Sequence, residues 1–280
     1  MQLHDDIIAG HLADILSAFE KLHAPHRHSF YHIALITRGS GTKTIDFEQF
    51  DIHPGMIYFM VPGQVHAWDI IKKTYGYVIN FSEKVFRSLI SNHYYLDKFP
   101  FLRGIPRNSV IGLKKDALKE VICLMNQICN EVKRKDGFSL DLICFHLLSL
   151  FICITRHNAV PLKKHIPEKR QNALFNFRML VNQHYKEKRL PKEYAALLYI
   201  TPNHLNSLCK DLLDKSAGQI IRDRILLEAK RLLVNLDISI AEIAYQLNFT
   251  DNSYFSKFFK KYTGSTPEEF RKHAIENGGE

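Results

Sequence analysis

Residues 239–261, SIAEIAYQLNFTDNSYFSKFFKK, decide the fold of the C-terminal part of this 280-residue chain. Their first part carries four apolar residues at helical spacing: Ile240, Ile243, Ala244 and Leu247. The tripeptide Asn248-Phe249-Thr250 predicts a tight turn, because asparagine tolerates the left-handed backbone that such a turn often needs. A second helix is expected from about Asp251, with aromatic side chains on one face and polar or lysine side chains on the other. These are the parts of a helix-turn-helix.

Residues 194–212 repeat this plan. Residues 194–198 predict a first helix, Tyr199-Ile200-Thr201 predicts a turn, and a second helix is expected from Pro202. Helices should begin near residues 202, 217, 240 and 267, because Thr201-Pro202 is an N-cap followed by proline and Ser216, Ser239 and Thr266 each begin an S/T-x-x-E/Q capping box. A longer helix over residues 217–235 is expected to space the two units. The alternative is a plain helical bundle with solvated polar faces, and two tandem units with matching turns count against it.

The stretch RILLEAKRLLVNLDISIAEIAYQLNFTDNSYFSKFFKKYTGSTPEEFRK, residues 224–272, closely resembles the C-terminal signature of AraC-type transcription regulators. The resemblance covers about residues 170–273 and runs through both units. It implies seven helices and two recognition helices that enter successive major grooves on one face of the DNA, about 34 Å apart. The sequence departs from the family at both turns, where Tyr199 and Asn248 stand in place of the usual glycine. Tyr199 therefore predicts a strained or altered first turn.

Position in the motif assigns the DNA contacts. Base-contacting candidates are Asn203, Asn206 and Ser207 in the first unit, and Asn252, Ser253, Ser256 and Lys257 in the second. Asparagine pairs bidentately with adenine and lysine reaches guanine acceptors, which is why these residue types suit base contacts. Lys210, Lys260, Lys261 and the backbone amides at the helix starts are expected to hold phosphates.

Residues 28–82 have a different character, with short β-rich runs between turns. Gly39-Ser40-Gly41 predicts a hairpin between two strands, and His53-Pro54-Gly55 and Val61-Pro62-Gly63-Gln64 predict further turns. Strands are expected at MIYFM, VHAWDI and TYGYVINF, so the segment predicts a β-sandwich or small barrel. Before it, apolar positions in residues 1–22 recur at helical spacing and predict a short amphipathic helix.

Residues 20–82 resemble the cupin-like sensing domain found in many members of the same family, through PHRHSFYHIALITRGSGTKTIDF and the His-Pro-Gly and Pro-Gly-Gln turns. Cupin enzymes bind a metal through an H-x-H pair, a later histidine and an acidic residue. His26, His28 and His66 fit the histidine positions, but His32 stands near the place of the acid, so no metal or other cofactor is expected. A small barrel has room for one small ligand. Five residues are the effector-binding candidates: His28, Arg38, His66, Trp68 and Tyr77.

Residues 116–156 return to helical periodicity. The apolar run from Leu140 to Ile154 is shorter than a membrane-spanning helix and contains Asp141, so it predicts a helix buried in a domain or at a dimer interface, with no membrane partner. The basic stretch 156–171 predicts an interdomain linker. Five cysteines without a CxxC pair, and an acidic N-terminus unlike a signal peptide, indicate a reducing, cytoplasmic setting.

Together these patterns predict an α+β chain of two domains. Residues 1–112 form a cupin-like β-barrel for sensing, residues 113–160 a helical dimerisation segment, and residues 161–280 an all-α double helix-turn-helix.

The net charge of +9 suits a polyanionic partner. The expected function is a sequence-specific, effector-responsive transcription activator. It has no enzymatic activity, binds double-stranded promoter DNA as a homodimer, and contacts RNA polymerase. Two alternatives stay open, a metal-dependent cupin enzyme with a helical appendage and a DNA-binding regulator without an effector.

Overall fold

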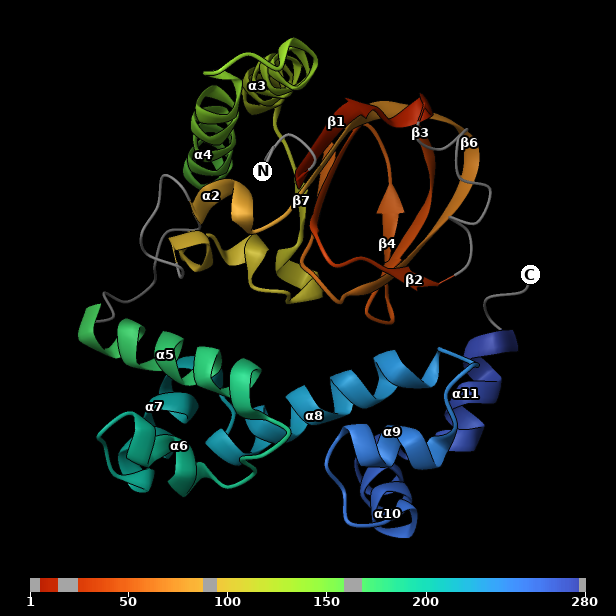
Figure 1. Cartoon of the computed structure of the whole chain (residues 1–280), viewed down its shortest axis with the longest axis vertical. Helices are drawn as coiled ribbons and strands as arrows, with labels where there is room; N and C mark the ends of the chain where they lie inside the picture. The colour runs from red at the N-terminus through yellow and green to blue at the C-terminus, as the bar shows by residue number, and fades with distance from the viewer. Residues whose placement is uncertain (1–5, 15–24, 88–94, 159–167, 277–280) are drawn as a thin grey trace. The chain divides into compact units, whose positions relative to one another are not determined.

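The computed structural model describes residues 6–14, 25–87, 95–158 and 168–276. The chain divides into two compact units, Met1–Pro161 and Leu162–Glu280, here called the N-terminal and the C-terminal unit. The N-terminal unit combines a curved sheet with helices, and the C-terminal unit is helical throughout its described part (Figure 1). The predicted α+β fold class is therefore confirmed. Most of the expected linker lies outside the described residues.

The described part of the N-terminal unit contains a sheet of seven strands: β1 (Ile7–His11), β2 (His26–Arg27), β3 (Tyr31–Ile45), β4 (Glu48–Ile52), β5 (Met56–Met60), β6 (Val65–Phe81) and β7 (Val110–Gly112). Their order is β1-β6-β3-β5-β7, with β2 paired to β6 and β4 paired to β3, and all pairs are antiparallel. The long strands β3 and β6 bend, so that the sheet curls into an open barrel (Figure 1).

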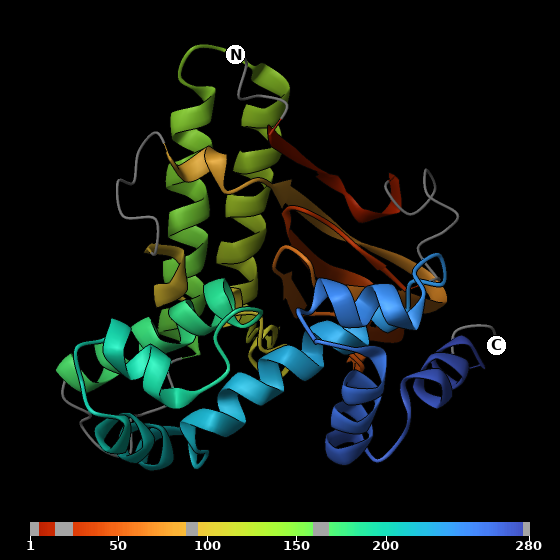
Figure 2. The same cartoon turned by 60° about the horizontal axis from the view of Figure 1, so that its bottom comes forward.

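Alternating side chains give the sheet two different faces. One face packs Ala34, Tyr58, Trp68 and Val78 into the barrel interior. The other face carries residues such as Phe59 and packs against helices α3 (Lys115–Arg134) and α4 (Ser139–His157), which lie side by side (Figures 1 and 2). The described part of this unit also contains the short helices α2 (Lys84–Arg87), η3 (Tyr95–Lys98), η4 (Pro100–Leu102) and η5 (Pro106–Asn108).

The predicted hairpin at Gly39-Ser40-Gly41 is wrong. Strand β3 continues through these residues, and its pairing with β6 shifts register there. A Cβ atom on Gly41 would lie 2.2 Å from the carbonyl oxygen of Asp69, so the glycines permit a bulge and a close approach of β6. The actual turn follows Ile45, at Asp46 and Phe47, whose φ angles of 45° and 72° fit a two-residue hairpin loop.

The helix predicted within residues 1–22 is wrong for residues 7–11, whereas residues 12–14 are helical. Residues Ile7–His11 form strand β1, which pairs with β6 from Ile7 opposite Phe81 to His11 opposite Tyr77. The open edge of β6 offers backbone hydrogen-bond partners, and this long-range pairing outweighs the local helical pattern.

Helix α4 contains the apolar run that attracted a membrane interpretation. Within the described ranges it is the one helix whose length and hydropathy would allow it to cross a membrane. Its Ile143, Leu147, Leu150 and Ile154 are fully buried in the core of the N-terminal unit, so packing accounts for one apolar side of the helix.

The described part of the C-terminal unit contains seven helices: α5 (Glu168–His184), α6 (Pro191–Leu197), α7 (Pro202–Leu213), α8 (Ala217–Leu233), α9 (Ile240–Gln246), α10 (Asn252–Thr263) and α11 (Pro267–Glu276) (Figure 2). Four of them begin at the predicted residues 202, 217, 240 and 267. The capping boxes form as predicted. The Ser239 hydroxyl accepts from the Glu242 amide at 3.2 Å, and the Glu242 carboxylate accepts from the Ser239 amide at 2.8 Å.

Candidate nucleic-acid interface and barrel interior

The first helix-turn-helix consists of α6, a turn and α7. Tyr199 occupies the turn with a φ of 54°, in the left-handed region where glycine is favoured, and its side chain is 96% exposed. The amide of Ile200 donates to the carbonyl oxygen of Ala195 at 3.0 Å and closes the turn. The Thr201 hydroxyl then accepts from the His204 amide at 3.2 Å and caps α7. The predicted strain at Tyr199 is therefore present.

The second helix-turn-helix, α9 to α10, has the same backbone plan. Asn248 adopts a φ of 57°, and the Phe249 amide donates to the carbonyl oxygen of Ala244 at 2.9 Å. Asp251 caps α10, because its Oδ1 accepts from the Tyr254 amide at 2.7 Å. Two units separated in sequence thus fold into turns of matching geometry, as their sequences predict.

Helices α7 and α10 each bury an apolar stripe and expose a polar one. Leu205, Leu208 and Cys209 of α7 and Phe255 and Phe259 of α10 are buried in the core of the C-terminal unit. The predicted DNA-contacting residues on the exposed faces are Asn203, Ser207 and Lys210 of α7 and Asn252, Ser253, Lys257, Lys260 and Lys261 at α10, while Ser256 is half-buried. This division leaves two polar helix faces open to a ligand.

Asn206 has a structural contact in addition to its expected role. It is half-buried, and its Oδ1 atom accepts from the backbone amide of Ala217 at 3.0 Å, at the start of α8. This bond gives Asn206 a role in anchoring the start of α8, and its contact with adenine stays a prediction, because the amide oxygen has a second lone pair. The exposed His204, next to Asn203, was not among the sequence candidates. The helical phase of α7 was the signal that could have identified it.

Arg189 joins the two helix-turn-helix units, and the sequence did not predict this. Its Nη2 atom donates to the carbonyl oxygens of Leu247 at 2.6 Å and Asn248 at 2.8 Å, and its guanidinium lies 4.0 Å from the centroid of the Phe249 ring. Asn248 Nδ2 donates in turn to the carbonyl oxygen of Lys186 at 3.4 Å. The loop that precedes α6 is therefore bonded to the turn that precedes α10.

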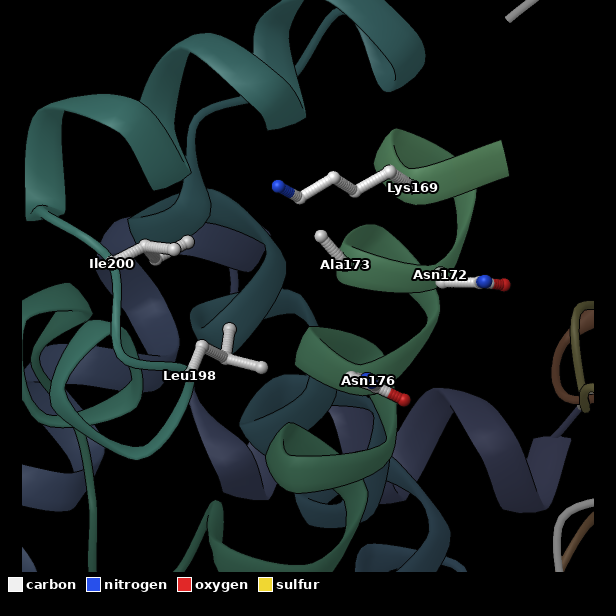
Figure 3. A pocket seen from close by; sticks show the side chains of 6 residues that line it. All are labelled: Lys169, Asn172, Ala173, Asn176, Leu198 and Ile200. Atoms are coloured by element: carbon white, nitrogen blue, oxygen red, sulfur yellow. The ribbon is translucent and has the colours of Figure 1, made fainter. Parts of the chain in front are cut away.

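An open groove of about 590 Å³ lies beside the first turn (Figure 3). Helix α5 contributes Lys169, Asn172 and Asn176 to one wall, and the turn contributes Leu198 and Ile200 to the other. Its open shape and mixed lining distinguish it from a closed ligand pocket.

The barrel interior gathers histidines from three strands or their ends. The ring centroid of His66 lies 4.4 Å from that of His26 and 4.9 Å from that of His28, because β2 pairs with β6 at His66. One ligand atom from each of these three histidines lies within 4.8 Å of the others, which is the grouping that a metal ion could use. The group consists of histidines alone, and His32 lies next to it, 5.7 Å from His66 between ring centroids.

Two of the five effector candidates do not join this cluster. Arg38 is exposed and lies over the Tyr75 ring, opposite Tyr75 in the β3–β6 register. Tyr77 belongs to the helix-facing side of the sheet and packs against His11. The bulged course of β3 places Arg38 away from the cluster, and alternation along β6 places Tyr77 on the other face of the sheet. His28, His66 and Trp68 remain on the interior side.

Lys43 is the interior residue that the sequence analysis missed. Its side chain is fully buried, with Nζ 3.2 Å from the centroid of the Trp68 ring. Burial lowers the pKa of Lys43 well below its usual value. Burial, reinforced by neighbouring positive groups, also lowers the pKa of His32 and His66, and lowers that of His28 to about 4. The imidazoles are therefore neutral at pH 7.

Comparisons with known proteins agree with both halves of this description. Residues 18–134 match the model of the AraC-like ligand binding domain, and residues 194–273 match that of a helix-turn-helix domain. The chain is 24% identical over 258 residues to the HTH-type transcriptional activator RhaR of Mannheimia succiniciproducens, covering 89% of this chain and 87% of the relative. It is 40% identical over 78 residues to the uncharacterized transcriptional regulatory protein YesN of Bacillus subtilis, covering 27% of this chain and 21% of that protein.

Among solved structures, ToxT from Vibrio cholerae is similar with a TM-score of 0.47 and 15% identity, over 95% of this chain and 98% of ToxT. The two family models together cover both units of the chain, and the helix-turn-helix match contains both turns described above. The chain therefore belongs to the AraC-type family of DNA-binding transcription regulators, with a ligand-binding domain that precedes a double helix-turn-helix.

Proposed function

We propose that this chain is an effector-responsive activator that contacts two neighbouring major grooves through α7 and α10. The single observation that carries the proposal is the pair of matching turns, each followed by a capped helix with its polar face exposed. Asn203 and Ser207 contact bases in one groove, and Asn252, Ser253, Ser256 and Lys257 do so in the other. Lys210, Lys260 and Lys261 hold the phosphates.

The barrel of the N-terminal unit binds the effector. His28, His66 and Trp68 support this role, because they point into one interior that also contains unpaired polar atoms. The name of the relatives called RhaR, transcriptional activators, supports activation rather than repression. An activator acts on RNA polymerase, so the proposal includes a contact with it. We assign no catalytic role to the chain.

A homodimer is supported by an apolar stripe along one side of α4. Phe138 is 75% exposed and Phe145 is 58% exposed, and Leu142 and Ile152 extend the same stripe at helical spacing. Exposed apolar stripes of this kind mark protein interfaces. All five cysteines are free, which suits the proposed cytoplasmic location.

The proposal is tested by selecting binding sites from random duplexes with the purified full chain, then mapping them by footprinting. We expect enriched sequences with two short conserved blocks one helical turn apart, about 10 base pairs. A single conserved block, or no enrichment above the salt-sensitive background, would contradict contact by both helices. A chain with Asn252, Ser253 and Lys257 all changed to alanine should lose one block and keep the other.

A further inference from the structure

Lys43 is an ionisable residue in the interior of the N-terminal unit, where burial disfavours its charged form unless an anion lies beside it. Among the residues that the structure describes, its Nζ atom has no hydrogen-bond acceptor, although the side chain is fully buried. The Trp68 ring at 3.2 Å and the Tyr58 ring at 5.8 Å face the ammonium group. Aromatic faces compensate only part of the hydration that a buried ammonium loses. The position therefore lacks an anionic partner.

Two buried histidines next to Lys43 supply the opposite chemistry. His32 Nδ1 lies 2.7 Å from Asn80 Oδ1, and His66 Nδ1 lies 3.3 Å from the carbonyl oxygen of Gln64. Because oxygen accepts in both contacts, the proton sits on Nδ1 in each neutral ring, and Nε2 carries a lone pair. Within the described part of the chain both Nε2 atoms are buried without a partner.

The nearby acid Asp46 does not serve as the partner of Lys43. Its carboxylate accepts from Gln64 Nε2 at 2.8 Å and from the Val65 amide at 3.2 Å, contacts that hold the β3–β4 turn against β6. The interior thus presents one amine, which an anionic ligand would hold in its ammonium form, and two neutral acceptors. A ligand that satisfies all three has a carboxylate and at least two hydroxyl groups, because each hydroxyl donates one hydrogen bond.

We infer that the barrel interior binds a small hydroxy-carboxylate, whose carboxylate pairs with Lys43 and whose hydroxyl groups donate to Nε2 of His32 and His66. This inference rests on the proposed effector role of the barrel and specifies its chemical class. The cationic donor selects an acid over a neutral polyol, and the two imidazoles select a hydroxylated acid over a plain one. Neutral imidazoles add no further positive charge, which favours a monoanion over a polyanion.

The experiment is a thermal-shift series on the full chain with D-galacturonate, D-glucuronate and D-gluconate as probes. D-galactose and D-glucose are the neutral counterparts, and cyclohexanecarboxylate is an acid without hydroxyl groups. We expect at least one hydroxy acid to raise the melting temperature by about 5 °C at saturating concentration, with little effect of the counterparts. If no hydroxy acid exceeds both its neutral counterpart and the plain acid, the inference is overturned.

The variant Lys43→Met tests the assigned contact. It removes an unpaired buried ammonium, so it should fold with a melting temperature at or above that of the wild type, and it should lose the response to the hydroxy acid. Lys115→Met, at an exposed position on α3, is the matched control and should keep the response. A Lys43→Met protein that responds like the wild type overturns the inference.

Two further measurements separate this inference from other outcomes. The melting temperature is also measured with ZnCl₂ or NiCl₂. If the metal raises it, EDTA returns it to the metal-free value, and His28→Gln shows no increase, the interior binds a cation instead of an acid. Binding of the wild type and Lys43→Met to a selected duplex is measured in parallel. Retained DNA binding without any acid response rejects only the ligand class, whereas absent DNA binding rejects the proposed function itself.

Discussion

The guanidinium of Arg189 donates a 2.8 Å hydrogen bond to the carbonyl oxygen of Asn248, the residue with left-handed backbone in the second turn. A second bond to Leu247 and the contact with the Phe249 ring make this a three-point attachment. It connects the loop before α6 to the turn before α10, in addition to the connection through α8. Arg189 therefore holds the two helix-turn-helix units in one relative orientation, which binding to two grooves requires.

Arg189→Ala should lower the free energy of unfolding of the full chain by about 1–3 kcal/mol, because two hydrogen bonds from a charged donor are lost. Affinity for a duplex with both half-sites should fall about tenfold, because the two units would lose conformational entropy when binding fixes their relative orientation. Affinity for a duplex with one half-site should change little. Chemical denaturation and fluorescence anisotropy with the two duplexes measure these effects.

Arg170→Ala is the matched control for this arginine. Arg170 forms a solvent-exposed ion pair with Asp211, and such pairs contribute little to stability. It should leave both the stability and the ratio of the two affinities near the wild-type values. Equal losses of affinity on both duplexes in Arg189→Ala would show that the residue does not orient the units.

Tyr199→Gly should stabilise the protein by about 0.5–1 kcal/mol. The φ of 54° is costly for a side chain with a Cβ atom, and the tyrosine ring is almost wholly exposed, so its removal loses little packing. Tyr199→Ala removes the same ring but keeps the Cβ atom, so it should not stabilise. Urea unfolding of the three proteins decides the matter. A destabilised Tyr199→Gly chain would mean that the ring contributes contacts that its exposure does not reveal.

Local signals account for what the sequence predicted well. The capping boxes at Ser216 and Ser239 and the N-cap at Thr201 fix helix starts through hydrogen bonds within four residues, so they could be identified without tertiary information. Left-handed backbone was likewise expected at Asn248, because asparagine tolerates it, and a strained turn at Tyr199, because the family usually has glycine there. The fold class and both helix-turn-helix units followed from such signals.

Long-range pairing accounts for what the sequence did not predict. Gly39 and Gly41 lie in a β-bulge because β6 approaches them closely. Residues 7–11 form a strand because they pair with β6. Arg189 finds its acceptors 58 residues or more along the chain. The local sequence of β3 gives no sign that Lys43 is buried, and only the folded barrel encloses its side chain. Such roles depend on contacts that no local pattern contains.

His28 should make the stability of the N-terminal unit depend on pH between about 6.5 and 4. Its pKa is lowered to about 4 in the folded chain, mainly by burial and then by His26 and Lys43, so the unfolded chain binds the proton more readily. Stability is therefore present above pH 6.5 and falls as the pH drops toward 4. The neighbouring His32 and His66, whose pKa values are also lowered, contribute in the same direction.

His28→Gln should reduce the slope of the free energy of unfolding against pH. The limit for one proton is about 1.4 kcal/mol per pH unit, and the reduction should be smaller because the imidazole is only half-buried. Denaturant unfolding at pH 7, 6, 5 and 4.5 measures the slope. His53→Gln changes an exposed histidine and should leave the slope as it is. An unchanged slope in His28→Gln would remove His28 from the interior cluster.

Phe145→Glu should convert the proposed dimer to a monomer. Phe145 lies within the exposed apolar stripe of α4, so a carboxylate there would be buried without a partner in a dimer interface. Lys119→Glu, on an exposed position of α3, provides the control for added negative charge. Sedimentation of the full chain at several concentrations reports the mass. A wild-type chain that remains monomeric throughout would refute the proposed use of this stripe.

Lys257→Ala and Lys260→Ala should differ in kind, because the proposal gives the two lysines different partners. Loss of Lys257 should cost about 1–3 kcal/mol on the preferred duplex and relax the preference at one base pair. Loss of Lys260 should weaken binding to preferred and altered duplexes equally. It should also reduce the slope of log Kd against the logarithm of the salt concentration by about one. Both side chains are exposed on α10, so neither change should disturb the fold. Titrations with single-base variants of a selected site, at several salt concentrations, separate the two patterns. If both variants weaken every duplex by the same factor, Lys257 contacts phosphate and the base-contacting face of α10 lies elsewhere.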